Sequence, residues 1–213
     1  MKSPSRKGMS AELQHLLMRD AIVVKQEVEL ANVIIGFDAA NRYSLSDPSG
    51  EFIGSAAEQG GGVGGFLIRQ FLNNNRPLTL HIYNLQGQEI AQGKKPFRFI
   101  FPEMTAVVDG QPLGRVRRRF KILKRKFTIE VGGIETFDIE SSIFQLGKLT
   151  FDVTRNGQKV ATISKNFEGF LKMAFTQADT FSIQFHDQNL TLQERFTLFI
   201  TLFLIDYDVF EQR

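Results

Sequence analysis

Near the end of the chain lies Phe196-Thr-Leu-Phe-Ile-Thr-Leu-Phe-Leu-Ile205, a stretch of ten residues without a charge. Thr191 and Glu194 stand three positions apart just before it, which is the spacing of a capping box and predicts the start of a helix. The helix is apolar on every face except at Thr197 and Thr201, whose hydroxyls can bond back to helix carbonyls. A helix that is apolar all round has to be buried.

The environment that buries this helix is either protein or bilayer. Spanning the hydrocarbon of a bilayer takes about 20 apolar residues, whereas this run has ten. Asp206 and Asp208 follow it directly, and placing each acid in hydrocarbon costs roughly 3 kcal/mol. We therefore predict a central core helix, with the two acids solvating its end where it leaves the core; a single membrane pass through it is the alternative. The side chains predicted to form the core are Phe196, Leu198, Phe199, Ile200, Leu202, Phe203, Leu204 and Ile205.

Upstream of this helix the sequence repeats one pattern, an alternating strand, a turn carrying Asp, Asn or Gly, and a second alternating strand. This is the signature of a β-hairpin. The five hairpins occupy residues 43–53, 80–90, 106–114, 127–139 and 149–160. About ten evenly spaced strands predict a sheet that closes on itself or packs as a sandwich, because an open sheet of that size exposes long edges.

Length and composition indicate one soluble-type domain. A chain of 213 residues with 42% apolar content can form one substantial core, and we assign it to residues 13–213 after a flexible tail over residues 1–12. A short helix leading into a strand is predicted at the start of this domain. Twenty-one Phe against three Tyr and no Trp predict an interior packed mainly by Phe.

The absence of Cys excludes disulfides, thiolate metal sites, cysteine catalysis and palmitoylation. The first ten residues are polar and basic, without the apolar segment of a signal peptide. Both features favour a cytoplasmic protein. No nucleophile elbow, paired-carboxylate motif or dinucleotide fingerprint occurs, so the sequence gives no support to an enzyme that makes or breaks bonds.

The mild net charge of +3 conceals a dense basic run over residues 115–126, in which eight of twelve positions are cationic. Its members are Arg115, Arg117, Arg118, Arg119, Lys121, Lys124, Arg125 and Lys126. On one face of a strand or hairpin these side chains would attract anionic phospholipid headgroups, by about 1 kcal/mol for each cation near the surface. A charged edge that prevents aggregation and attraction to nucleic-acid phosphate are the alternatives, and we favour the headgroups.

The stretch Phe175-Thr-Gln-Ala-Asp-Thr-Phe-Ser-Ile-Gln-Phe185, followed by Phe203-Leu-Ile-Asp-Tyr-Asp-Val-Phe-Glu211, resembles the C-terminal signature of the phospholipid scramblase family. Upstream, Arg76-Pro-Leu-Thr-Leu80 and Asn84-Leu-Gln-Gly-Gln-Glu89 fall in the family's order, and the match covers about residues 13–211. The resemblance implies a mainly β, tubby-like fold, in which a closed barrel of twelve strands surrounds a C-terminal apolar helix. It also implies bidirectional, calcium-stimulated movement of phospholipids between the leaflets of a bilayer.

The calcium loop implied by the resemblance maps to residues 177–188. Such a loop needs oxygen ligands at alternating positions, Gly at the sixth and Glu at the twelfth, where this chain has Ser182 and Gln188. Asp179 and Asp187 are the candidate metal ligands, and no other cofactor is expected. Since the apolar residues alternate, we favour the interpretation that this segment is the last β-strand of the barrel.

Members of the family from animals carry Cys clusters that take palmitate, and this chain has none. Its membrane association must therefore rest on other contacts and be peripheral and reversible. Two functions stay open. One is phospholipid transport; the other is a non-catalytic module that binds anionic headgroups, a partner protein or nucleic acid without moving lipid. Transport through the barrel would require the central helix to leave it, which exposes the apolar lining.

Overall fold

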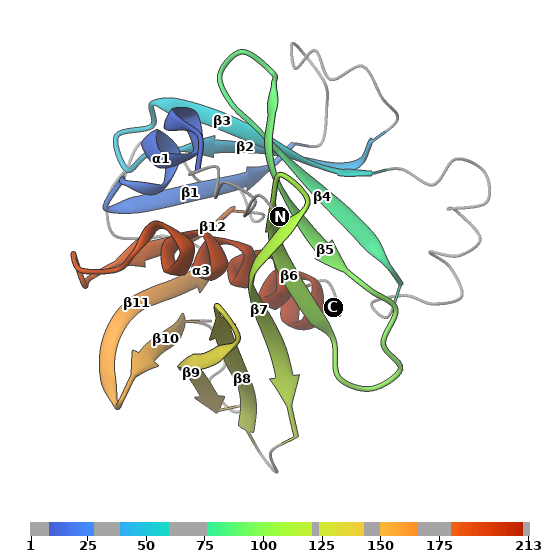
Figure 1. Ribbon diagram of the computed structural model, residues 1–213, viewed down its shortest axis with the longest axis vertical. Helices are drawn as coiled ribbons and strands as arrows, with labels where there is room; N and C mark the ends of the chain where they lie inside the picture. Colours follow the sequence, from blue (N-terminus) through green and yellow to red (C-terminus); the bar gives the residue numbers. More distant parts are fainter. Residues whose placement is uncertain are drawn as a thin grey trace, which may run out of the picture.

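The computed structural model describes residues 9–27, 39–59, 76–120, 124–142, 150–165 and 180–210, which form one β-barrel with helices at the start and end of the chain (Figure 1). The helices are α1 (Ala11–Leu17), α3 (Leu192–Ile205) and the π-helical turn η2 (Asp206–Phe210). The strands are β1 (Ala21–Gln26), β2 (Ala39–Ser46), β3 (Phe52–Gln59), β4 (Leu78–Tyr83), β5 (Glu89–Lys95), β6 (Glu103–Val108), β7 (Gln111–Arg119), β8 (Lys124–Val131), β9 (Ile134–Ser142), β10 (Thr150–Arg155), β11 (Gln158–Lys165) and β12 (Thr180–Phe185). Helix α1 begins within the predicted tail, of which residues 1–8 lie outside the described part.

The barrel is an antiparallel meander of twelve strands, in which each strand pairs with the next along the chain. Strands β1 and β12 close it, with Ile22 opposite Ile183. All five predicted hairpins are present, as β2–β3, β4–β5, β6–β7, β8–β9 and β10–β11. Asp109 and Asn156 have positive φ angles of 49° and 51° at their turns, as tight hairpin turns require. The predicted closed barrel is confirmed.

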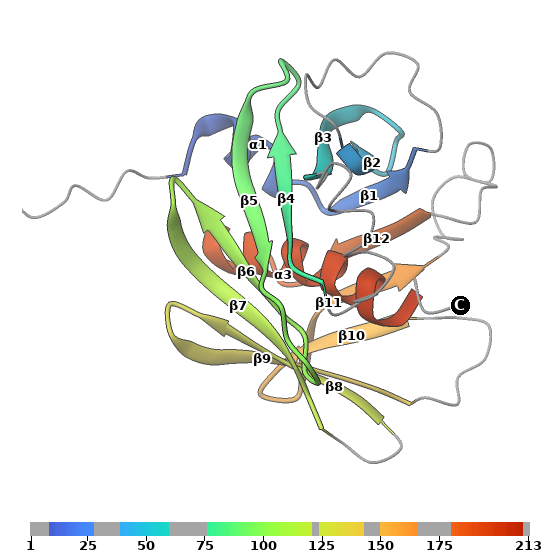
Figure 2. The same cartoon turned by 90° about the vertical axis from the view of Figure 1, so that its right-hand side faces the viewer.

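Helix α3 runs through the middle of the barrel, with strands around it in both views (Figures 1 and 2). Every residue from Arg195 to Ile205 is buried, which confirms the predicted core helix. The Phe203 ring of α3 packs edge to face against two rings of the barrel wall and one of its own helix, since its centroid lies 5.3 Å from that of Tyr43, 5.8 Å from that of Phe181 and 5.3 Å from that of Phe199. The interior is therefore packed by Phe, as its composition predicts.

Two glycines let the wall of the barrel approach α3 closely. A Cβ atom at Gly114 on β7 would collide with the side chain of Thr197. A Cβ at Gly93 on β5 would lie 3.1 Å from Ile200 Cδ1 and 2.6 Å from Met104 Cε. Because protein interiors are close-packed, these positions fix where the helix rests against the strands.

The start of α3 is held by the predicted capping box, in which Thr191 accepts from the backbone of Glu194 and the Glu194 carboxylate accepts from Thr191. Thr197 Oγ1 donates to a carbonyl one turn earlier at 2.7 Å, as does Thr201 Oγ1 at 2.8 Å, so the two hydroxyls are satisfied within the helix. A buried cation, Arg195, adds a link that the sequence did not suggest. It donates to the carbonyl oxygens at the end of α1 and lies 4.7 Å over a Phe ring of β12.

Candidate functional site: the cationic strands and the end of the central helix

The basic run forms the adjacent antiparallel strands β7 and β8. Successive side chains of a strand point to opposite faces, so Arg115, Arg117 and Arg119 share the outer face while Val116 points into the barrel and is fully buried. The three arginine side chains are about one-third exposed, at 36%, 29% and 36%. Lys121 and the side chain of Lys124 lie outside the described part of the molecule.

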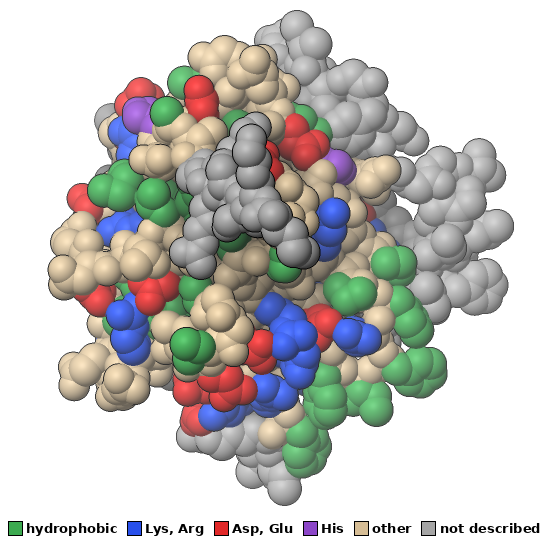
Figure 3. Space-filling view, viewed as in Figure 1, with side chains coloured by type: hydrophobic (Ala, Val, Ile, Leu, Met, Phe, Trp, Pro, Cys, Tyr) green, Lys and Arg blue, Asp and Glu red, His purple; other side chains and the backbone are tan. Residues whose placement is uncertain are grey.

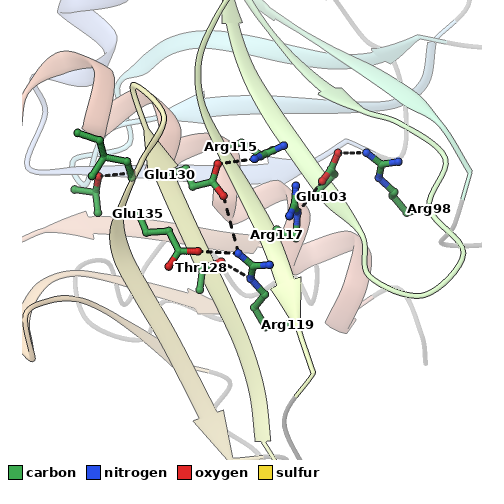
Figure 4. A network of polar contacts seen from close by, with 10 residues as sticks. Arg98, Glu103, Arg115, Arg117, Arg119, Thr128, Glu130 and Glu135 are labelled. Atoms are coloured by element: carbon green, nitrogen blue, oxygen red, sulfur yellow. Dashed lines mark hydrogen bonds and ion pairs between the residues drawn. The ribbon is translucent and has the colours of Figure 1, made fainter.

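Glu103 on β6 binds two arginines of this surface (Figure 4). Arg98 Nη2 donates to its carboxylate at 2.5 Å and Arg117 Nε donates at 2.9 Å. Burial alone would raise the pKa of Glu103, but the hydrogen bonds and charges of the two arginines hold it below its ordinary value. Glu103 is therefore a fixed anion that neutralises part of the run.

Acids from β8 and β9 bind the remaining outer cations (Figure 4). Arg115 Nη2 donates to Glu130 at 2.5 Å, and Arg119 donates to Thr128 Oγ1 and to Glu135, both at 2.8 Å. In the part of this face that the structure describes, the cations Arg98, Arg115, Arg117, Arg119 and Lys126 pair with the acids Glu103, Glu130, Glu135, Asp138 and Glu140. Five charges of each sign balance, so this face is less cationic than the basic run suggests.

Arg118 lies in a different environment from Arg117 and Arg119, because its Nη1 atom donates at 3.0 Å to the carboxylate of Asp208 in η2. Asp208 is only 4% exposed. Burial raises its pKa, while the charges of Arg118, Arg125 and Lys95 oppose this shift. Asp206 is 5% exposed. The prediction that both acids solvate the end of the helix is therefore wrong, because the chain continues into a buried turn and cations from the barrel wall neutralise Asp208.

The candidate calcium ligands are not brought together in the described part of the chain. Asp179 lies outside it, and Asp187 Oδ1 accepts from the backbone and side chain of Asn189 at 2.9 and 3.2 Å. Residues 180–185 form β12, which confirms the strand interpretation. Among the described residues, no group of three or more His, Asp or Glu side chains is placed to hold a metal ion. Calcium binding stays a prediction.

Sequence reasoning missed a group of exposed apolar side chains, which we call the aromatic tip. Its members are Phe97, Phe99, Ile100 and Phe101 of the β5–β6 loop and Phe120 at the end of β7. The prediction that Phe packs the interior does not hold for these residues. The available signal was local, since Pro96 and Pro102 bracket a loop that is otherwise apolar apart from Arg98.

Comparison with known proteins assigns the family. The model of the scramblase family matches residues 1–212, almost the entire chain. This chain belongs to the scramblase family. The resemblance of the C-terminal signature is thereby confirmed, together with the barrel and central helix that it implied.

Proteins from animals and fungi are similar in sequence to this chain. Phospholipid scramblase 2 of Homo sapiens is 31% identical over 94% of this chain and 70% of its own length. Phospholipid scramblase family member 5 of Homo sapiens is 26% identical over 93% of this chain and 77% of its own. Altered inheritance rate of mitochondria protein 25 of Saccharomyces cerevisiae is 24% identical over 92% and 72%. No solved structure matches the chain significantly.

The central helix of this scramblase-family barrel also bears on the alternative of a single membrane pass. Helix α3 has 14 residues, whereas a span takes about 20. None of the helices in the described residues is long and apolar enough to cross a membrane. The single-pass alternative therefore has no support in the described structure.

Proposed function

We propose that this protein acts at phospholipid bilayers and moves phospholipids in both directions between the two leaflets. The observation that carries the proposal is the family match over residues 1–212, together with relatives that are named phospholipid scramblases. The protein attaches peripherally to the cytoplasmic surface of a membrane that contains anionic lipids. Calcium stimulation belongs to the same proposal, with Asp179 and Asp187 as its candidate ligands.

The enclosed helix restricts how lipid can move. Eight apolar side chains of α3 are fully buried in the barrel, and burial stabilises each by roughly 1.5–3 kcal/mol. Removing the helix into water would therefore cost on the order of 12–24 kcal/mol, which is comparable to or larger than the total stability of roughly 5–15 kcal/mol of an ordinary domain. We place the path of the headgroups on the outer surface of an intact barrel.

A second candidate function is favoured by the same enclosed helix. A barrel whose interior is filled offers no channel, so a module that binds anionic headgroups without transport fits its geometry equally well. On the outer face of β7 and β8 the paired charges weigh against phosphate of either kind, from nucleic acid or from a lipid headgroup, because phosphate contacts would have to displace the carboxylates of Glu103 and Glu130 from their arginines.

Reconstitution into liposomes separates the two functions. The liposomes carry a fluorescent phospholipid whose outer-leaflet copies are bleached by an impermeant reductant, with calcium or with a chelator. Transport is expected to increase the bleached fraction beyond the half reached in protein-free liposomes. Sedimentation with the liposomes without extra bleaching in either condition would support the binding module, and failure to sediment would overturn both functions.

A further inference from the structure

The aromatic tip is a contiguous apolar surface at one end of the barrel. Phe99 is 81% exposed, Phe120 75% and Ile100 67%. In Figure 3, hydrophobic side chains gather at the rim of the molecule beyond a mixed group of Lys, Arg, Asp and Glu side chains, on the side where the β5–β6 loop and the end of β7 lie in Figure 1. Single exposed apolar side chains are ordinary, whereas grouped ones mark an interaction surface.

The pairing of β6 with β7 brings the two segments of the tip together. Glu103 lies opposite Arg117 in the ladder. The next step outward is a backbone hydrogen bond of 3.0 Å from Arg118 N to Pro102 O. The β5–β6 loop and Phe120 therefore leave the barrel side by side. Within the loop, the rings of Phe97 and Phe99 pack edge to face at 6.2 Å, so the tip has internal order.

Exposed cations lie beside the tip. Lys94 and Arg98 lie next to its loop residues, and Phe120 stands between Arg119 and Lys121 in the sequence. Some of these cations are paired, since Glu103 binds Arg98 and Glu135 binds Arg119. Lys94 is exposed, and the Arg98 side chain is 51% exposed although it also binds Glu103. Long cationic side chains can extend from an apolar surface toward phosphate groups while their stems stay against hydrocarbon.

An apolar tip with exposed cations beside it is chemically complementary to an anionic membrane surface. Phe and Ile bring the apolar area that membrane-surface segments bury at the boundary between headgroups and acyl chains. The neighbouring Lys and Arg would meet the phosphates just above that boundary. We propose that the aromatic tip inserts into the headgroup–acyl boundary of anionic bilayers and fixes the orientation of the barrel on the membrane.

This inference rests on the proposed function, because it requires that the protein acts at a phospholipid bilayer. It adds which end of the barrel faces the membrane. The outer strands β6–β9, with their balanced charges, then stand beside the membrane surface and do not lie flat against it.

A spectroscopic test uses the absence of Trp from the chain. In the Phe99→Trp variant the fluorescence reports from the tip alone, and in the Ile134→Trp control it reports from a side chain that is 71% exposed at the other end of β8. With vesicles of phosphatidylserine and phosphatidylcholine, the Phe99→Trp emission is expected to shift to the blue and to be quenched by lipids brominated on the acyl chain. The control emission is expected to stay unchanged.

A sedimentation test uses two triple variants of similar exposure. Replacing Phe99, Ile100 and Phe120 with Ser is expected to lower partitioning onto the same vesicles by about tenfold or more. Replacing Met18, Leu85 and Ile134 with Ser, which are 64%, 51% and 71% exposed, is expected to leave it unchanged. Circular dichroism and thermal unfolding establish that both variants fold.

The outcomes distinguish this inference from the proposed function. Wild-type binding without a blue shift in the Phe99→Trp variant would overturn the inference and leave the proposed function standing. Equal losses in the two triple variants, or altered self-association of the tip variant with unchanged vesicle binding, would also overturn it. A wild-type protein that neither sediments with vesicles nor moves lipid would overturn both.

Discussion

The interior of the barrel and the outer surface at its aromatic tip use the same residue types for opposite purposes. Phe203 is fully buried among other rings, whereas Phe99 is 81% exposed. Each region also holds an acid beside arginines, but burial raises the pKa of Asp208 inside and the pKa of Glu103 is lowered outside. Residue type alone therefore does not assign a role. The position relative to the barrel wall decides whether a Phe fills the core and whether a carboxylate is ionised at little cost.

The largest expected effect comes from the interior. Replacing Phe203 with Ala should destabilise the barrel by about 3–5 kcal/mol, because it removes buried apolar area and leaves a cavity among the surrounding rings. Urea unfolding followed by circular dichroism measures the change. A loss below about 1 kcal/mol would show that α3 is not packed in the barrel as the structure has it.

The sequence predicts the interior well because its signals are local. Alternation within a strand, Asp or Asn with Gly at a turn, and a charge-free stretch behind a capping box all act within a few residues. The closing pair β1–β12 and the acids that face the basic run are different. Val24 on β1 pairs with Phe181 on β12, and Glu103 on β6 binds Arg117 on the neighbouring strand β7. These contacts depend on the register of the finished sheet.

The same reason explains the errors at the ends of the barrel. The buried Asp208 binds Arg118 on β7, and the charges of Arg125 and Lys95 on two further strands, all distant from it in sequence, also favour its ionised form. Phe99 is exposed because it lies in a loop beyond the barrel wall, although its residue type predicts a place in the core. Both cases require the position of the wall before the residue can be interpreted.

The next largest effect is expected at the outer acid. Glu103 is 5% exposed and accepts from Arg98 and Arg117, so Glu103→Gln should cost about 1–3 kcal/mol at pH 7. Because the pKa of Glu103 is lowered by folding, its stabilisation is present above the ordinary value of 4.5 and is lost as the pH falls through the lower folded pKa. The difference between the two proteins in urea unfolding should therefore shrink below about pH 4.5.

The inner acid should show the opposite dependence on pH. Folding raises the pKa of Asp208, so the folded protein binds the proton more tightly, and wild-type stability falls as the pH rises from 3.8 through the higher folded pKa. Asp208→Asn removes this titration, so the stability of the variant relative to the wild type should increase over that pH range. At neutral pH we expect a net difference below about 1 kcal/mol, because the lost ion pair offsets the relieved burial. A wild-type advantage that grows with pH in urea unfolding would contradict this.

The smallest expected effect on stability comes from the tip. Phe99→Ser should change the free energy of unfolding by less than about 0.5 kcal/mol, because an 81% exposed side chain loses little contact with the barrel. The same kind of residue thus differs by several kcal/mol between the two regions. Thermal unfolding of this variant and of Phe203→Ala under one set of conditions checks the contrast. At ~25 cal/mol per Å² of buried apolar area, a loss of about 2 kcal/mol or more at Phe99 would mean that the ring is covered in solution. The tip would then be part of the fold and not a surface available to a membrane.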